Sequence, residues 1–211
     1  MDNISKFFAF CLRKCFGWEI IKRDVEKMNK HSPCIIVCNH QSSLDLITLM
    51  EVYPKRCSTL AKKELIWAGP FGLGSWLSGL IFIDRLNPEK ARDTMTKTVR
   101  KITNENIKLL IFPEGTRHAG EMLPFKKGGF HLAVQAQIPI VPLVISSYEL
   151  FCSKKPKRFD DGKVIVQALD PIPTVGMTAE NVTELAETTR DKMAKVFEEI
   201  NKELKQMVKK S

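Results

Sequence analysis

The chain has 211 residues, with 44% hydrophobic and 27% charged residues, so it is long enough for one globular domain with a sizeable core. This composition is close to the average for soluble proteins, which argues against wholesale disorder and against a protein built mainly of membrane-spanning helices. The 33 Lys and Arg exceed the 24 Asp and Glu, and the formal net charge of +9 favours phosphate-bearing partners: nucleic acid, an anionic membrane surface or a phosphorylated substrate.

Residues 1–30 are expected to form an N-terminal helical segment at a membrane interface, ahead of a main domain that spans residues 31–211. Its apolar run is interrupted by Arg13 and Lys14 and is too short to span a bilayer, which needs about 20 apolar residues. Apolar side chains at helical spacing are typical of a helix that lies in a membrane interface. Here they are Phe7, Phe8, Cys11, Leu12 and Cys15. A terminal helix packed on the core fits this pattern equally well.

Six apolar runs in the remaining chain are expected to be strands. They are residues 34–38, 57–61, 80–83, 108–112, 139–145 and 163–168. Most are separated by helix-like stretches, the clearest of which begins with Asn87 as N-cap and Pro88 in the first turn. A last helix runs from about Thr178 to the lysine-rich end of the chain. Alternation of this kind predicts an α/β fold with a largely parallel central sheet flanked by helices.

The uncharged segment "LIWAGPFGLGSWLSGLIFI", residues 65–83, is broken up by glycines and a proline. It is expected to form a short helix, a glycine-rich bend and a strand. Trp67, Phe71 and Trp76 can lie in the core or among lipid headgroups, and the core is the preferred interpretation for each.

The six cysteines are unevenly spaced and mostly have apolar neighbours, which favours free thiols over a disulfide framework. The string "HSPCIIVCNH" resembles a metal-binding pattern. In a strand, however, Cys34 and Cys38 would lie about 13 Å apart and could not share a zinc ion.

A candidate acid–base pair follows the first of these strands, in "NHQSSLD". On a regular helix, His40 and Asp45 would point roughly 140° apart, so they can meet only across a turn. A turn from Asn39 to Ser43, followed by a helix from about Leu44, would let the Asp45 carboxylate bind one imidazole nitrogen. The other nitrogen would then serve as a base. A purely structural turn with a capped helix is the alternative.

Two further strands end in polar clusters. "GLIFIDR" ends in Asp84 and Arg85, and "KLLIFPEGTRH" ends in residues 113–117. Gly115 permits a tight turn, and Arg117 can bind a phosphate through two parallel hydrogen bonds. Each arginine alone could simply form a surface salt bridge. Three clusters at the carboxyl ends of strands instead indicate a ligand site at that edge of the sheet.

These residues carry a resemblance to the glycerolipid acyltransferases. "NHQSSLD", "GLIFIDR", "FPEGTR" and "IPIVPLVI", residues 138–145, resemble the four motifs of that family in order and spacing. Residues 31–173 resemble in particular the animal 1-acylglycerol-3-phosphate acyltransferases. The resemblance implies the glycerolipid acyltransferase fold, with residues 31–211 as the catalytic domain.

The resemblance also implies a reaction, in which a fatty acyl group moves from acyl-CoA to the 2-hydroxyl of lysophosphatidic acid. His40 would be the catalytic base and Asp45 would orient it. The acceptor phosphate would be bound by the residues of two motifs, namely Arg85, Glu114, Gly115, Thr116 and Arg117. Acyl-CoA would be a co-substrate, and neither a metal nor a prosthetic group is implied. The expected location is a membrane, that of the endoplasmic reticulum.

Several alternatives remain at this stage. The acceptor could be another lysophospholipid or glycerol 3-phosphate, and the protein could be a non-catalytic module that binds anionic membranes. A serine hydrolase using Ser42 or Ser43 lacks the expected G-x-S-x-G sequence. A nucleic-acid binder is not expected, because no recognised motif appears. The animal relatives usually begin with membrane-spanning segments, so attachment through the amphipathic start and the basic cluster "KKPKR", residues 154–158, is considered against a solvated loop.

Overall fold

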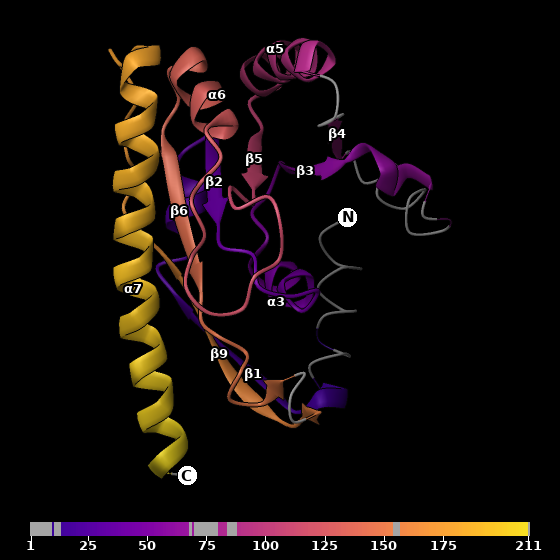
Figure 1. Cartoon of the computed structure of the whole chain (residues 1–211), viewed down its shortest axis with the longest axis vertical. Coiled ribbons are helices and arrows are strands. Elements are labelled where there is room, and N and C mark those ends of the chain that lie inside the picture. The colour runs from indigo at the N-terminus through magenta and orange to yellow at the C-terminus, as the bar shows by residue number, and fades with distance from the viewer. Residues whose placement is uncertain are drawn as a thin grey trace.

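A computed structural model describes residues 10, 14–67, 69, 80–83, 88–153 and 157–210. Its centre is a seven-stranded sheet in the order β1-β9-β6-β2-β5-β3-β4 (Figure 1). The strands are β1 (Trp18–Arg23), β2 (Cys34–Cys38), β3 (Cys57–Lys62), β4 (Ile81–Ile83), β5 (Lys108–Ile111), β6 (Ile140–Ile145) and β9 (Gly162–Ala168). Neighbouring strands are parallel except β6 and β9, which are antiparallel. The predicted α/β fold with a largely parallel sheet is confirmed.

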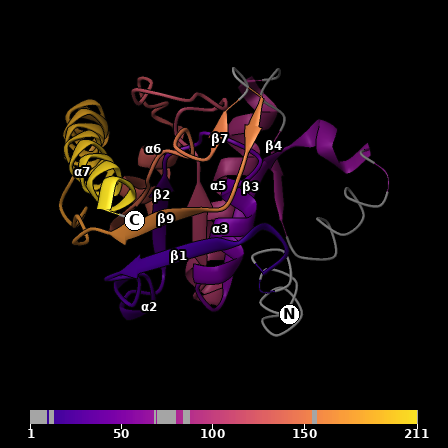
Figure 2. The ribbon, with the colours of Figure 1, turned by 90° about the horizontal axis from the view of Figure 1, so that it is seen from below.

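Helices cover both faces of this sheet. They are α2 (Lys27–Lys30), α3 (Asp45–Val52), α5 (Pro88–Glu105), α6 (Gly128–Ala136) and α7 (Val182–Lys210), with the short 3₁₀ turns η1 (Lys63–Trp67) and η2 (Ala179–Asn181). Apolar residues of α5, α6 and α7 form a core on one face, and residues of α2 and α3 form a core on the other. Figure 2 shows α7 and α2 on opposite sides of β1 and β9.

All six predicted strands are present. They could be predicted because strands that are buried on both faces appear in the sequence as short apolar runs. The expectation of a helical segment over residues 1–30 is wrong for Trp18–Arg23, which form β1 and pair in parallel with β9. Trp18 and Ile20 are buried while Glu19 is exposed, which is the alternation of a strand. A small two-stranded sheet of β7 (Cys152–Ser153) and β8 (Arg158–Phe159) was also not predicted.

The two predicted helices are confirmed in position. Helix α5 begins at Pro88, and Asn87 lies outside the described residues. The last helical stretch starts with a capping box between Thr178 and Asn181, passes through η2 and continues as the 29-residue α7. Apolar residues at helical spacing along α7, such as Val182, Leu185, Ile200 and Leu204, are buried in the core on the α7 face of the sheet.

The uncharged segment of residues 65–83 is described only in part. Trp67 is 85% exposed, so the preferred interpretation of a core position is wrong for this residue. Phe71 and Trp76 lie outside the described residues. Across the described part of the chain, none of the helices combines the length and the apolar character that crossing a bilayer requires.

The cysteines that the structure describes are free, as expected. Cys34 and Cys38 are buried along the single strand β2. Burial raises the pKa of Cys34 to about 11 and that of Cys57 to about 12, so both remain thiols at neutral pH. Cys15 is exposed, and Cys11 lies outside the described residues.

Candidate active site

The site begins where β2 leaves the middle of the sheet. Asn39 follows β2 directly and is almost fully buried. Its side-chain amide donates to the Ile145 carbonyl at 2.9 Å, and its side-chain oxygen accepts from the Ile145 N–H at 2.8 Å. The side chain thus continues the pairing of β2 with β6 by one step. The backbone just before His40 is therefore held in place at the carboxyl edge of the sheet.

His40 and Asp45 form the hydrogen bond that the sequence predicted, with 2.7 Å between Nδ1 and Oδ2. The turn and the start of α3 at Asp45 also match the prediction. Oδ2 of the fully buried Asp45 further accepts from the backbone N–H groups of Gln41 at 2.9 Å and Ser42 at 3.0 Å. Because Asp45 accepts from Nδ1, Nε2 is the nitrogen that carries the lone pair of the neutral imidazole.

His40 is also held by the loop that follows β5. Its backbone N–H donates to Oε1 of Glu114 at 2.8 Å, and its carbonyl accepts from the His118 N–H at 2.9 Å. The imidazole stacks on the Phe112 ring with 4.0 Å between centroids. The side chain is 18% exposed, and Nε2 has no partner among the residues that the structure describes. The ring is therefore fixed in orientation while its basic nitrogen remains available.

Both carboxylate oxygens of Glu114 are used by backbone donors. Oε2 accepts from the Leu123 N–H at 3.1 Å, so this 5% exposed side chain links the turn at His40 to both ends of the β5 loop. Burial raises the pKa of Glu114, although its hydrogen bonds from His40 and Leu123 act in the opposite direction. These hydrogen bonds hold the backbone of His40 in place. Binding of the acceptor phosphate by Glu114 stays a prediction, which the two occupied carboxylate oxygens do not favour.

Two cationic side chains lie on the outer side of this loop. Gly115 has a left-handed φ of +72°, and a Cβ added there would meet Nζ of Lys126 at 2.7 Å. The Lys126 ammonium thus lies directly over Gly115, whose left-handed backbone conformation favours glycine. Arg117 is exposed two residues further along, next to the exposed Thr116. Arg117 and Lys126 thus give this loop two exposed cationic groups, each of which can bind an anion.

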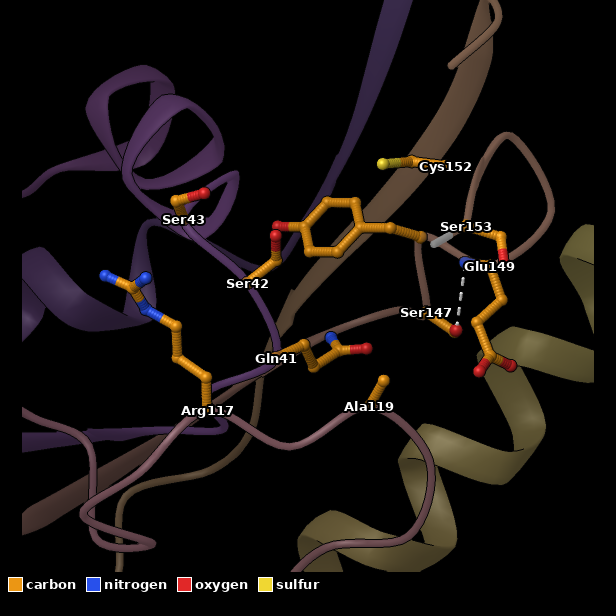
Figure 3. Close-up of a pocket in the computed structure, with 10 residues that line it drawn as sticks. Gln41, Ser42, Ser43, Arg117, Ala119, Ser147, Glu149, Cys152 and Ser153 are labelled. Carbon is orange, nitrogen blue, oxygen red and sulfur yellow. Dashed lines mark hydrogen bonds between the residues drawn. The ribbon is translucent and has the colours of Figure 1, made fainter. Parts of the chain in front are cut away.

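A cavity of about 450 Å³ opens beside Gln41 and Ser42, the two residues that follow His40, although neither His40 nor Asp45 is among the residues that line it. Three chain segments line it: the turn after β2, the β5 loop, and the segment from the end of β6 to β7. The lining residues are Gln41, Ser42, Ser43, Arg117, Ala119, Ser147, Tyr148, Glu149, Cys152 and Ser153. Figure 3 shows Arg117 and Ser43 on one side of the cavity and Ser147, Glu149 and Cys152 on the other, with the Arg117 guanidinium on the side of Ser43. Its walls thus combine hydroxyl groups with the Arg117 guanidinium and the Glu149 carboxylate, and the turn that carries His40 forms one side.

The comparisons agree with this geometry. A family model described as "Acyltransferase" matches residues 19–146, which is more than half of the chain. The chain belongs to the acyltransferase family. This acyltransferase is 46% identical over 200 residues to human 1-acyl-sn-glycerol-3-phosphate acyltransferase alpha, covering 94% of the chain and 71% of the human protein. The 1-acyl-sn-glycerol-3-phosphate acyltransferase of Haemophilus influenzae is 39% identical over 190 residues, covering 90% of the chain and 78% of that protein.

A solved structure shows the same fold. The crystal structure of the 1-acyl-sn-glycerophosphate (LPA) acyltransferase PlsC from Thermotoga maritima matches with a TM-score of 0.76 at 23% identity, covering 94% of this chain and 79% of that chain. The acyltransferase fold that the four motifs implied is confirmed.

The structure brings together most of the predicted site residues of the acyltransferase. Asp45 and Glu114 each form a hydrogen bond with His40, and Gly115, Thr116 and Arg117 follow Glu114 in the same loop. Arg85 lies outside the described residues. Lys126 was not predicted as a site residue, although the basic pair in "LPFKKGGF" was a signal that could have been followed. Ser42, the candidate nucleophile of the hydrolase alternative, accepts from the Leu44 N–H at 3.3 Å and supports the turn.

Glu114→Gln is expected to lower kcat about tenfold while changing the acceptor KM by less than about threefold. An amide keeps one acceptor oxygen, so either the His40 or the Leu123 N–H loses its partner, at a cost of about 1–3 kcal/mol. Steady-state kinetics and thermal unfolding check this. Glu121→Gln, an exposed acid in the same loop, is the matched control and should behave as wild type. A Glu114→Gln enzyme with normal kcat and a raised acceptor KM would contradict this prediction and assign Glu114 to phosphate binding instead.

Proposed function

We propose that this acyltransferase moves a fatty acyl group from acyl-CoA to the 2-hydroxyl of lysophosphatidic acid, giving phosphatidic acid and CoA. The observation that carries the proposal is the His40–Asp45 hydrogen bond at the sheet edge, in a turn whose Gln41 and Ser42 line a cavity together with Arg117. The names of the human and Haemophilus relatives support the same reaction.

In the proposed reaction, Nε2 of His40 takes the proton from the 2-hydroxyl as its oxygen attacks the thioester carbonyl. The new ester C–O bond forms, the C–S bond breaks, and the proton passes to the leaving CoA sulfur. Asp45 stabilises the imidazolium that exists between these steps. A thioester is already activated, so a base and correct positioning are sufficient, and the proposal includes no acyl-enzyme, metal or prosthetic group.

The acceptor phosphate would be bound by Arg117 and Lys126. Arg117 lines the cavity, and Lys126 lies over Gly115 in the same loop as Glu114, which contacts His40. Charge-assisted hydrogen bonds from a guanidinium and an ammonium group suit a phosphate monoester. This arrangement would place the glycerol 2-hydroxyl near Nε2 while the phosphate stays at the cationic end.

A panel of acceptors tests the substrate assignment. Purified protein is incubated with labelled acyl-CoA and lysophosphatidic acid, lysophosphatidylcholine, glycerol 3-phosphate or monoacylglycerol, each dispersed in detergent. We expect kcat/KM to be highest for lysophosphatidic acid, because only this acceptor combines an acyl chain with a terminal phosphate. A preference for glycerol 3-phosphate or for a zwitterionic lysophospholipid would replace the proposed acceptor within the same chemistry.

We also propose that the protein works at an anionic membrane, that of the endoplasmic reticulum. Phe16 and Phe159 are 37% and 50% exposed and pack edge to face with 5.1 Å between centroids. Two exposed basic side chains are close in sequence: Lys14 is two residues before Phe16, and Arg158 directly precedes Phe159. Phe159 belongs to β8, whose partner β7 contributes Cys152 and Ser153 to the cavity wall. Aromatic rings with nearby basic residues suit a membrane interface.

Replacing both Phe16 and Phe159 with serine is expected to weaken binding to phosphatidylserine-containing vesicles by about fivefold or more, because apolar area no longer enters the interface. Cosedimentation measures the bound fraction, and raising the salt concentration should weaken the wild type as well. Val175→Ser, at a 79% exposed apolar residue elsewhere, is the control. If wild type and the double variant bind equally, the aromatic pair is not the docking surface.

A further inference from the structure

The two oxygens of the Asp45 carboxylate have very different surroundings. Oδ2 accepts three hydrogen bonds, from His40, Gln41 and Ser42. Oδ1 is buried and has no hydrogen-bond partner among the residues that the structure describes. A buried, unpaired carboxylate oxygen is costly, by about 1–3 kcal/mol or more. A donor for Oδ1 is therefore expected in the working enzyme.

Tyr148 is the side chain that can supply this donor. Its hydroxyl lies 3.0 Å from Oγ1 of Thr48. Thr48 is one turn after Asp45 in α3, and the three side chains are buried together. Burial and, next, the negative charge of Asp45 raise the pKa of Tyr148 well above its usual range. Its contact with Thr48, one turn from Asp45 on the same helix, places the phenol near the carboxylate, and the raised pKa keeps the phenol protonated at neutral pH.

We propose that Tyr148 is a positioning residue for acyl transfer, whose hydroxyl donates to Oδ1 of Asp45 while accepting from the Thr48 hydroxyl. The proposal rests on the proposed function of His40 as the base. Donation to Oδ1 holds the carboxylate plane, and the carboxylate in turn holds the imidazole through Oδ2. The proposed series of hydrogen bonds, Thr48–Tyr148–Asp45–His40, thus links the base to a residue that lines the cavity.

The ring of Tyr148 is fixed by its surroundings, so its hydroxyl is aimed rather than free to rotate away. It packs edge to face on Phe151, with 6.1 Å between centroids, and Phe151 packs on Trp18 of β1 at 5.4 Å. Tyr148 also lines the cavity. An acceptor seated there would contact the same side chain that orients Asp45.

The proposal predicts a specific change in pH dependence. The titratable groups facing Asp45 are His40, Tyr148 and Cys38, and Glu114 adjoins the same turn. Burial, followed by the charges of Asp45 and Glu114, raises the pKa of Cys38, so this thiol is neutral like the phenol. A hydrogen bond at Oδ1 draws negative charge away from Oδ2. Without it, Asp45 stabilises the imidazolium more strongly, and the protonated base persists to higher pH.

The chain offers a matched control, because it contains only two tyrosines. Tyr53 is also hydrogen-bonded to a threonine, with 2.7 Å between its hydroxyl and Oγ1 of Thr59. Burial raises the pKa of Tyr53 too, and this pair lies at the other end of α3 from Asp45. Tyr53→Phe therefore removes a similar buried hydrogen bond without touching the carboxylate.

The test compares Tyr148→Phe with Tyr53→Phe in the full chain, with lysophosphatidic acid and acyl-CoA as substrates. We expect Tyr148→Phe to lower kcat about tenfold, with KM values within about twofold of wild type. The acid limb of its kcat/KM profile should move about half a pH unit upward. Tyr53→Phe should retain the wild-type kcat and pH profile. Wild-type kcat and an unmoved acid limb in folded Tyr148→Phe, or equal losses in the two variants, would overturn the proposal.

A second readout does not depend on turnover. The imidazole nitrogen–proton resonances of His40, assigned with His40→Gln, should move in Tyr148→Phe and stay unchanged in Tyr53→Phe. If Tyr148→Phe does not fold, Thr48→Val removes the supporting donor instead, and Thr48→Ser should restore the wild-type resonances. Unmoved resonances in Tyr148→Phe, or in Thr48→Val where that variant takes its place, would contradict the role of Tyr148 whether or not the acyl acceptor has been correctly assigned.

Discussion

Replacing His40 with alanine is expected to lower kcat by about 10² to 10⁴, because general-base catalysis by a positioned imidazole contributes a factor of this size. Nε2 is the available nitrogen of a ring that is held by Asp45, by Phe112 and by the backbone contact to Glu114. The fold and acyl-CoA binding should persist, because the ring contributes little to either core. Steady-state kinetics, circular dichroism and acyl-CoA binding check the three parts of this prediction.

Two comparisons sharpen the result. Asp45→Asn should also be severe, because an amide can donate to Nδ1 and stabilise the wrong tautomer. His131→Ala, on the exposed side of α6, should have nearly normal turnover. Near-normal turnover in a folded His40→Ala protein would exclude this histidine as the base.

Arg117→Ala is expected to raise the KM for lysophosphatidic acid about tenfold to a hundredfold, because charge-assisted hydrogen bonds contribute roughly 1.5–3 kcal/mol. Arg117 lines the cavity on the side opposite Ser147 and Glu149 (Figure 3). Arg117→Lys should recover only part of the loss, because an ammonium group cannot form two parallel hydrogen bonds to a phosphate. Initial rates with each substrate varied in turn provide the measurement.

The acyl-CoA KM should change much less, and an acceptor without a phosphate should not distinguish Arg117→Ala from wild type. Arg100→Ala, at an exposed arginine of α5, is the charge-matched control. If Arg117→Ala weakens acyl-CoA and leaves lysophosphatidic acid unchanged, this arginine belongs to the CoA site instead.

The sheet was largely predictable from the sequence, because its central strands are buried on both faces and appear as apolar runs between helix signals. Strand β1 was missed for a local reason. "WEIIKR" is half polar and directly follows an amphipathic stretch with helical spacing, so the helical pattern was extended over it. It pairs with β9, more than 140 residues further along the chain, and the local spacing of apolar residues does not reveal such a distant partner.

The same distinction applies to the site. The contact between His40 and Asp45 was predictable because the two residues are five apart and only one local geometry, a turn, lets them meet. The support from Glu114 joins residues 74 apart, and Tyr148 meets Thr48 across 100 residues. Such contacts arise from the order of the parallel strands, whose carboxyl ends bring β2, β5 and β6 together. The motifs point to candidate site residues in the sequence, whereas long-range contacts such as these become known only from the fold.

The central claim is that His40, oriented by Asp45, is the base for direct transfer of an acyl group from acyl-CoA to lysophosphatidic acid, without an acyl-enzyme. Its most direct test is a single experiment in which labelled acyl-CoA and lysophosphatidic acid are incubated with purified wild type or His40→Ala, and labelled phosphatidic acid and released CoA are quantified together. We predict equal molar amounts of the two products with wild type, the label at the 2-position, and almost none of either with His40→Ala. CoA release without phosphatidic acid in the wild type, or equal product from both proteins, would contradict it.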